Sequence, residues 1–157
     1  MSQVLRSQPL SAVAFVSLLR AHAAATRQLN AQLSAEHGLT ISDFEVLLRL
    51  GRAPERRMRR VDLAGELLLT ASGITRLLDG LERAGYVERG ACSEDRRVVY
   101  AVLTDAGLEK LREAAESHFE QVDDLFRARF EEQELDELAA LLSRLGGDDG
   151  TDCEPPT

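Results

Sequence analysis

One helix followed by two short strands constrains the fold of this 157-residue chain more than any other feature. Thr70 is a good N-cap for the helix, whose apolar residues recur three or four positions apart in one stripe, namely Ile74, Leu77, Leu78 and Leu81. Gly85 ends this helix, and the pattern then changes to that of two strands, 86–89 and 98–103. The polar residues 90–97 between the strands predict a β-hairpin with an exposed tip.

Two helices are expected before this segment. Residues 9–37 carry apolar residues at three- and four-residue steps, and Gly38 is the expected C-cap of a long helix. A second helix should follow directly, with Ser42 as its N-cap and Glu45 at the spacing of a capping box. The N-terminal part of the chain is therefore predicted to be helical throughout.

The remaining pattern places a helix before and two helices after the hairpin region. A short helix at 61–68 joins the helix that follows Thr70 through a tight turn, which indicates a helix-turn-helix. After the hairpin, Thr104 starts a helix that runs to about Phe130, and a last helix spans 132–145. The predicted fold class is mainly α with a small β-hairpin wing, that is, a winged helix-turn-helix with long flanking helices.

The charges are divided unequally along the chain. The formal net charge is −8, yet residues 49–97 hold eleven arginines against eight acidic residues, while residues 98–157 carry sixteen acidic residues against five basic ones. Arginine suits bidentate contacts with phosphates and guanine edges. The densest cluster of arginines comprises Arg52, Arg56, Arg57, Arg59 and Arg60. It could contact nucleic acid, or it could equally be a solvated loop.

Several protein classes are excluded by what the sequence lacks. No apolar run approaches the length of about 20 residues that crosses a bilayer, and the N-terminus does not read as a signal peptide. The two cysteines cannot form a disulfide framework, and the three histidines lack metal-ligand spacing. No phosphate loop, carboxylate pair or nucleophile–base arrangement is recognisable. We therefore expect a cytoplasmic protein without enzymatic activity, cofactor, metal or membrane association.

Local motifs in this order resemble the MarR family of winged-helix transcription regulators. DLAGELLLTASGITRLLDGLERAGYVER (62–89) is similar to the family's positioning helix, recognition helix and first wing strand, and SEDRRVVYAVLTDAGLEKL (93–111) to its wing and following helix. Within the second segment, residues 95–97 fit the family's Asp-x-Arg signature and residues 103–107 fit its Leu-Thr-x-x-Gly junction. The resemblance covers nearly all of residues 10–145.

The resemblance implies a homodimer that binds double-stranded DNA at a pseudo-palindromic operator. Residues 1–38 and 104–146 would form a helical dimerisation region, residues 39–103 the winged helix-turn-helix DNA-binding domain, and residues 147–157 a disordered acidic tail. A bundle formed within one chain is the alternative use of the flanking helices.

The resemblance also assigns candidate DNA-binding residues. On the recognition helix, Ser72, Thr75 and Arg76 would reach base edges or phosphates, although they could be ordinary solvated residues. Arg97 would enter the minor groove from the wing, oriented by Asp95, although the two could form only a salt bridge. Phosphate contacts are expected from Arg96, Arg59 and Arg60. Asp79 marks the edge of this surface or pairs with Arg83.

A small-molecule site is expected near the first helix. His22 could line a pocket there, with Phe15 and Phe44 as walls, although such residues more often fill a core. The resulting prediction is a repressor released from DNA by a phenolic or aromatic-acid effector. A ligand-independent regulator and a winged helix that docks proteins instead of DNA are the alternatives.

Overall fold

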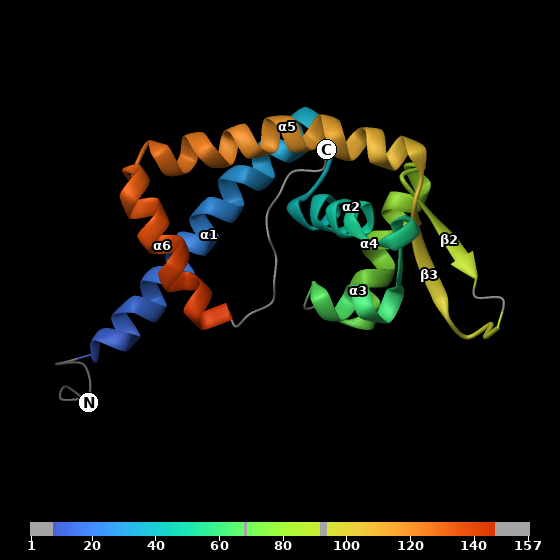
Figure 1. The fold of residues 1–157 in the computed structure, drawn as a ribbon, viewed down its shortest axis with the longest axis horizontal. Coiled ribbons are helices and arrows are strands. Elements are labelled where there is room, and N and C mark those ends of the chain that lie inside the picture. Colours follow the sequence, from blue (N-terminus) through green and yellow to red (C-terminus); the bar gives the residue numbers. More distant parts are fainter. Residues whose placement is uncertain (1–7, 68, 92–93, 147–157) are drawn as a thin grey trace.

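The computed structural model describes residues 8–67, 69–91 and 94–146, and its helices and strands follow the predicted order with one added strand. Figure 1 shows the long helix α5 along one side of the molecule, with α1 and α6 near one of its ends and α2, α4 and the strands near the other. None of the described helices is both long and apolar enough to cross a membrane. The elements are α1 (Leu10–His37), α2 (Ile41–Arg52), the short 3-10 helix η1 (Pro54–Arg56), β1 (Arg57–Arg59), α3 (Arg60–Glu66), α4 (Ala71–Arg83), β2 (Val87–Ala91), β3 (Val99–Leu103), α5 (Asp105–Arg127) and α6 (Glu132–Gly146).

The cap of α2 differs from the predicted one. Thr40, not Ser42, is the N-cap: its Oγ1 accepts a hydrogen bond of 3.1 Å from the Asp43 N–H, and its own N–H donates to the Asp43 carboxylate at 2.8 Å. The pair Thr40 and Asp43 and the predicted pair Ser42 and Glu45 both have capping-box spacing. Gly38 adopts the left-handed conformation at φ 67° and ends α1. Helix α2 begins at Ile41, so Ser42 already lies in its first turn and cannot be its N-cap.

Besides the short 3-10 helix η1, strand β1 is the element that the sequence pattern did not predict. It pairs antiparallel with β3 in a three-stranded sheet of order β1–β3–β2, with Arg57 opposite Val102. The Arg57 guanidinium also lies 4.0 Å from the centre of the Tyr100 ring, a cation–π contact. Part of the arginine cluster is therefore structural, and the wing is anchored to the segment that enters α3.

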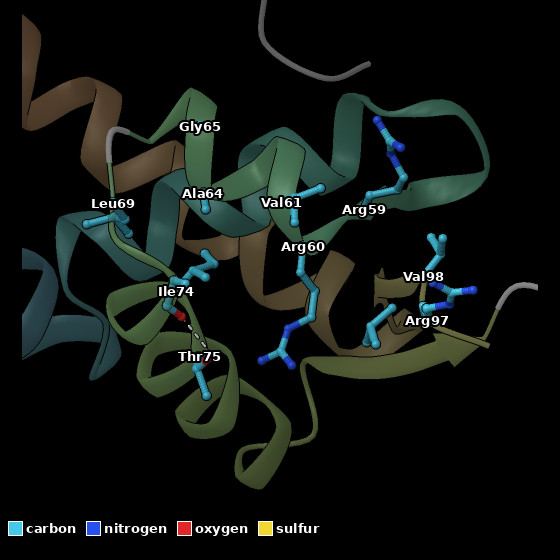
Figure 2. Close-up of a pocket in the computed structure, with 12 residues that line it drawn as sticks. Arg59, Arg60, Val61, Ala64, Gly65, Leu69, Ile74, Thr75, Arg97 and Val98 are labelled. Atoms are coloured by element: carbon cyan, nitrogen blue, oxygen red, sulfur yellow. Dashed lines mark hydrogen bonds between the residues drawn. The ribbon is translucent and has the colours of Figure 1, made fainter. Parts of the chain in front are cut away.

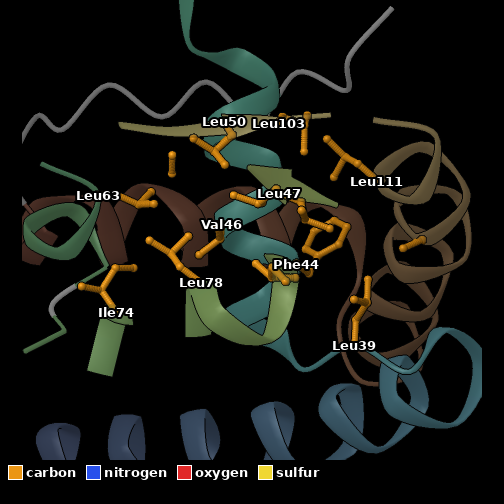
Figure 3. Packing of buried hydrophobic residues seen from close by; sticks show 14 of the residues in the cluster. Leu39, Phe44, Val46, Leu47, Leu50, Leu63, Ile74, Leu78, Leu103 and Leu111 are labelled. Atoms are coloured by element: carbon orange, nitrogen blue, oxygen red, sulfur yellow. The ribbon is translucent and has the colours of Figure 1, made fainter. Parts of the chain in front are cut away.

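The core lies beneath the helix-turn-helix and ties it to α5. Figure 3 shows side chains from α2, α3, α4 and α5 meeting in one cluster. Each large apolar side chain buried there contributes about 1.5–3 kcal/mol. Because α4 inserts Ile74, Leu78 and Leu81 into this cluster, as predicted, its opposite face must point outward, while Leu77 is only partly buried. The largest of the fully buried side chains are Leu33, Leu47, Leu50, Leu63, Leu78, Leu111 and Val46.

The junction between the wing and α5 is closely packed. Thr104 caps α5 as predicted, because its Oγ1 accepts a hydrogen bond of 3.0 Å from the Gly107 N–H. The Thr104 N–H donates to the Tyr86 carbonyl at 3.1 Å, and its hydroxyl donates to the Gly85 carbonyl at 2.7 Å. A Cβ at Gly107 would lie 2.7 Å from Leu103 Cδ1, so glycine is required by space here.

The flanking helices leave much apolar surface uncovered. Of the stripe predicted along α1, only Leu29 and Leu33 are buried, whereas Leu10 is 83% exposed. Helix α5 ends at Arg127, short of the predicted Phe130, because a tight turn precedes α6. Among the described residues of these helices the exposed large apolar side chains are Leu10, Val13, Phe15, Val16, Leu18, Leu19, Leu141, Leu142 and Leu145, and Phe130 follows α5.

Candidate nucleic-acid interface

The N-terminal half of α4 presents a small polar surface. Thr70 caps this helix as predicted, with its Oγ1 accepting from the Gly73 N–H at 3.1 Å. Ser72, Thr75 and Arg76 are all exposed, on the side of α4 away from the core. The Thr75 hydroxyl donates to the Ala71 carbonyl at 2.8 Å, which fixes its rotamer while leaving an oxygen lone pair for an external donor.

The described part of the wing tip is ordered by Asp95. Its Oδ1 accepts a hydrogen bond of 2.9 Å from the Arg97 N–H, the contact of an Asx-turn, and its carbonyl accepts one of 3.2 Å from the Val98 N–H. The Arg97 Nε lies 3.8 Å from the same carboxylate, yet the Arg97 side chain is 95% exposed. Arg96 is exposed as well. The turn therefore projects two guanidinium groups into solvent while restricting their backbone.

A pocket of about 600 Å³ connects the helix-turn-helix to the wing. Its wall includes Thr75 from α4, Arg97 from the wing, and Arg59 and Arg60 from the start of α3 (Figure 2). We call the exposed surface of α3, α4 and the wing around this pocket the HTH–wing face, made of Arg59, Arg60, Ser72, Thr75, Arg76, Arg96 and Arg97.

The two arginines at the start of α3 differ in their contacts. Arg59 donates two hydrogen bonds to the Asp62 carboxylate, of 2.7 and 2.9 Å, and this pairing raises its guanidinium pKa. The Arg60 side chain enters the space between α4 and the wing, where its Nη2 is buried and has no hydrogen-bond partner (Figure 2). A buried donor without a partner is energetically costly.

Sequence reasoning missed Arg89, which contacts the same helix from strand β2. The Arg89 Nε donates to both Glu82 carboxylate oxygens, at 3.0 and 3.2 Å, and its Nη2 donates to Asp79 Oδ1 at 3.2 Å. Hydrogen bonding to Glu82 is the main reason why the Arg89 pKa is raised. Asp79 thus pairs with Arg89 and not with Arg83, which donates to the Asp79 carbonyl. No regular spacing links Arg89 to these acids, so only the folded hairpin reveals the contact.

The structure separates the three residues proposed as effector-site walls. Phe15 is 60% exposed and His22 is also exposed, whereas Phe44 is buried in the core. The Phe44 ring lies 4.7 Å from that of His118, whose pKa is lowered by burial and whose Nδ1 has no hydrogen-bond partner. Phe44 therefore fills the core of one chain, apart from the solvent-facing side chains of α1.

Comparison with known proteins decides the family. A model of the MarR family matches residues 37–98. The crystal structure of AbsC, a MarR family transcriptional regulator from Streptomyces coelicolor, is 31% identical, and the match covers 89% of this chain and 94% of AbsC with a TM-score of 0.79. The chain belongs to the MarR family. Like its relatives, this MarR-family protein is a transcriptional regulator and not an enzyme.

Two further relatives of this MarR-family protein bear on its activity. Sco3205, a MarR family transcriptional regulator from Streptomyces coelicolor, was crystallised in complex with DNA; it is 27% identical, with 90% of this chain and 89% of Sco3205 covered and a TM-score of 0.80. The transcriptional repressor YetL from Bacillus subtilis is 32% identical over 111 residues, which span 71% of this chain and 66% of YetL.

Proposed function

We propose that this protein is a homodimeric transcriptional repressor that binds a pseudo-palindromic operator in double-stranded DNA and is released by a small-molecule effector. The observation that carries the DNA-binding proposal is the HTH–wing face, where Thr75 of the recognition helix and the 95% exposed Arg97 of the wing line one pocket. Polar hydroxyls and guanidinium groups on one continuous surface suit simultaneous contact with bases and phosphates.

Each side chain of the HTH–wing face has a proposed role. Helix α4 would enter the major groove, so that Ser72, Thr75 and Arg76 reach base edges, while Arg97 reaches into the minor groove. Asp95 acts through Arg97, whose backbone it holds. Phosphate contacts are assigned to the remaining cations of this face, Arg59, Arg60 and Arg96.

The uncovered apolar surface of the flanking helices supports the homodimer. We assign residues 1–38 and 104–146 to dimerisation and residues 39–103 to DNA binding, while the predicted acidic tail, 147–157, lies outside the described residues. Leu10 at one chain end and Leu145 at the other are 83% and 77% exposed. Apolar patches this extensive are uncommon on monomers and mark interaction surfaces.

Repression is inferred from the relatives, and effector control from the exposed side chains of α1. YetL is a repressor, and Sco3205 was crystallised with DNA, which supports the same activity here. The effector site is proposed around Phe15 and His22, which would become walls of a pocket only when a second chain covers α1.

The protein-docking alternative lacks a matching surface. An apolar patch on the HTH–wing face would favour it. Among the described residues of α3, α4 and the wing, the exposed large apolar side chain is Val61, at 71%. Single exposed apolar residues are normal on protein surfaces. DNA therefore remains the better-supported partner.

Selection from a random duplex library, followed by fluorescence anisotropy, tests DNA binding. We expect the full-length protein to enrich a palindromic sequence and to bind it at least about 1,000-fold more tightly than scrambled DNA. Arg97→Ala and Arg76→Ala should each weaken binding about tenfold or more, since a good base contact is worth about 1–3 kcal/mol. Arg112→Ala on α5, which removes an exposed cation elsewhere, is the control.

The outcomes of these experiments distinguish sequence-specific DNA binding and effector control from their alternatives. Failure to enrich any duplex, or equal binding to selected and scrambled DNA, would refute sequence-specific recognition. Titration of the complex with 4-hydroxybenzoate tests the proposed effector class, and retention of the DNA at every concentration would favour a ligand-independent regulator.

Sedimentation equilibrium tests the dimer. The mass should be twice the 17.3 kDa of one chain. Leu19→Asp places a charge on the uncovered face of α1 and should yield monomers, because an unpaired charge is not tolerated in an apolar interface. Val61→Asp, which changes an apolar residue of α3 that is 71% exposed against 52% for Leu19, should leave the mass unchanged. A monomeric wild-type protein would overturn the proposal.

A further inference from the structure

The contact between Arg89 and the recognition helix places a cation of the wing against two acids of α4. Asp79 lies one helical turn after Thr75 and Arg76, and Glu82 lies one turn further. Their side chains are 43% and 25% exposed, so neither carboxylate is removed from solvent by burial. Arg89 reaches both of them with three hydrogen bonds from strand β2.

We propose that Arg89 is a positioning residue for DNA binding, which acts by partly neutralising Asp79 and Glu82 on the recognition helix and not by touching DNA. This inference rests on the proposed DNA-binding function. It assigns a role to a residue outside the exposed cations of the HTH–wing face.

The charges of α4 explain why neutralisation is needed. The exposed part of the helix carries Arg76 and Arg83 together with the two acids, so its own side chains sum to zero. Double-stranded DNA presents one phosphate charge per about 1.7 Å of its axis, and charges within a Debye length of about 8–10 Å interact. Carboxylates one and two turns beyond the base-reading residues therefore lie within range of phosphates in the bound state.

Two of the five N–H groups of Arg89 are directed at the acids of α4, although its side chain is 56% exposed. Its Nε is shared between both Glu82 oxygens and one Nη2 proton goes to Asp79. If Nε and Nη2 turned toward a phosphate instead, both carboxylates would be released beside the DNA, and binding would gain little. By contrast, Arg97 is 95% exposed and 3.8 Å from its acidic neighbour, so it can leave that neighbour at small cost.

A thermodynamic cycle tests the proposal with the full-length protein and the duplex that it selects. The operator affinity is measured for the wild type, Arg89→Ala, Asp79→Asn/Glu82→Gln and the triple variant. We expect Arg89→Ala to weaken binding about tenfold at about 50 mM salt and about threefold at about 300 mM, since salt screens the exposed acids. In the acid-free background, the same change should cost less than about twofold.

Two matched variants keep the result interpretable. Arg127→Ala removes another arginine that is half exposed and paired with an acid, Asp123 at 2.7 Å, but on α5. It should leave the affinity within about twofold of wild type. Arg89→Lys keeps the charge and should bind within about threefold, which guards against a folding defect in the alanine variant. Thermal unfolding of each variant is followed in parallel.

The outcomes are distinct for the inference and for the proposed function. An equal loss on Arg89→Ala with and without the two acids would overturn the inference, because it would mean that Arg89 contacts the DNA directly. An unchanged affinity of Arg89→Ala would overturn it as well. A wild-type protein that selects no duplex would refute the proposed DNA binding itself.

Discussion

Replacing Gly107 by alanine should destabilise this protein, although alanine is the better helix former. The added Cβ would lie 2.7 Å from Leu103 Cδ1 and 2.9 Å from the carbonyl carbon of Tyr86, and the backbone cannot yield as a flexible side chain would. Overpacking of this kind costs about 1–3 kcal/mol. Displacing Tyr86 also strains the hydrogen bond that its carbonyl accepts from Thr104, worth about 1 kcal/mol. Helix propensity returns at most about 1 kcal/mol, so the expected net loss is about 1–3 kcal/mol.

Urea unfolding followed by circular dichroism, at one fixed protein concentration, measures this loss. Gly80→Ala is the matched control, because Gly80 also lies within a helix but has no atom within 4 Å of its hypothetical Cβ. That variant should gain about 0.5–1 kcal/mol. The two substitutions are thus expected to have opposite signs. A Gly107→Ala protein within about 0.5 kcal/mol of wild type would refute the steric reasoning.

Three further predictions concern single contacts. Burial lowers the pKa of His118, so the unfolded chain binds more protons than the folded chain below about pH 6.5. The free energy of unfolding should therefore fall as the pH drops from there to the lowered pKa, by at most about 1.4 kcal/mol per pH unit. In urea unfolding, His118→Gln should flatten this slope, whereas His22→Gln should not. Thr70→Ala should remove about 1 kcal/mol of stability with its cap, measured in the same way, and an unchanged midpoint would exclude that role. Asp95→Ala should weaken operator binding about two- to tenfold in anisotropy at an unchanged melting temperature, and an equal loss with the neighbouring Glu94→Ala would point to a general charge effect.

The sequence predicted those elements whose signal is local. The stripe on α4 and the cap at Thr70 are set by residues within a few positions of one another, and both were confirmed. Strand β1 was not predicted because three residues are too few to show an alternation of apolar and polar side chains. Only its pairing with β3 makes this segment a strand. The cap of α2 was predicted wrongly because two overlapping pairs, Thr40 with Asp43 and Ser42 with Glu45, have the same spacing. Only the structure shows that Thr40 caps the helix.

In the candidate site, too, contacts between residues close in sequence were predicted and contacts made only by folding were not. Asp95 and Arg97 are two residues apart, and the resemblance predicted that Asp95 orients Arg97; the structure adds the hydrogen bond between them, while their role toward DNA stays a prediction. The contact of Arg89 with Asp79 and Glu82 depends on how the hairpin folds back on α4, which no spacing encodes. The effector-site residues Phe15 and Phe44 depend on the packing of helices that are distant in sequence, and one chain does not bring them together.

The length of α5 gives this protein a mechanical property. Its 23 residues extend for about 35 Å, with the first half fixed in the core by Leu111 and Ala114 and the second half reaching α1 and α6. A tilt of α5 about its fixed half, beside the wing, would therefore move mainly its far end. A tilt of about 5° moves its far end by about 3 Å, close to the 3.4 Å rise of one base pair. A shift of about 3 Å where α1, α5 and α6 meet thus corresponds to a tilt of about 5° at the end of α5 beside the wing.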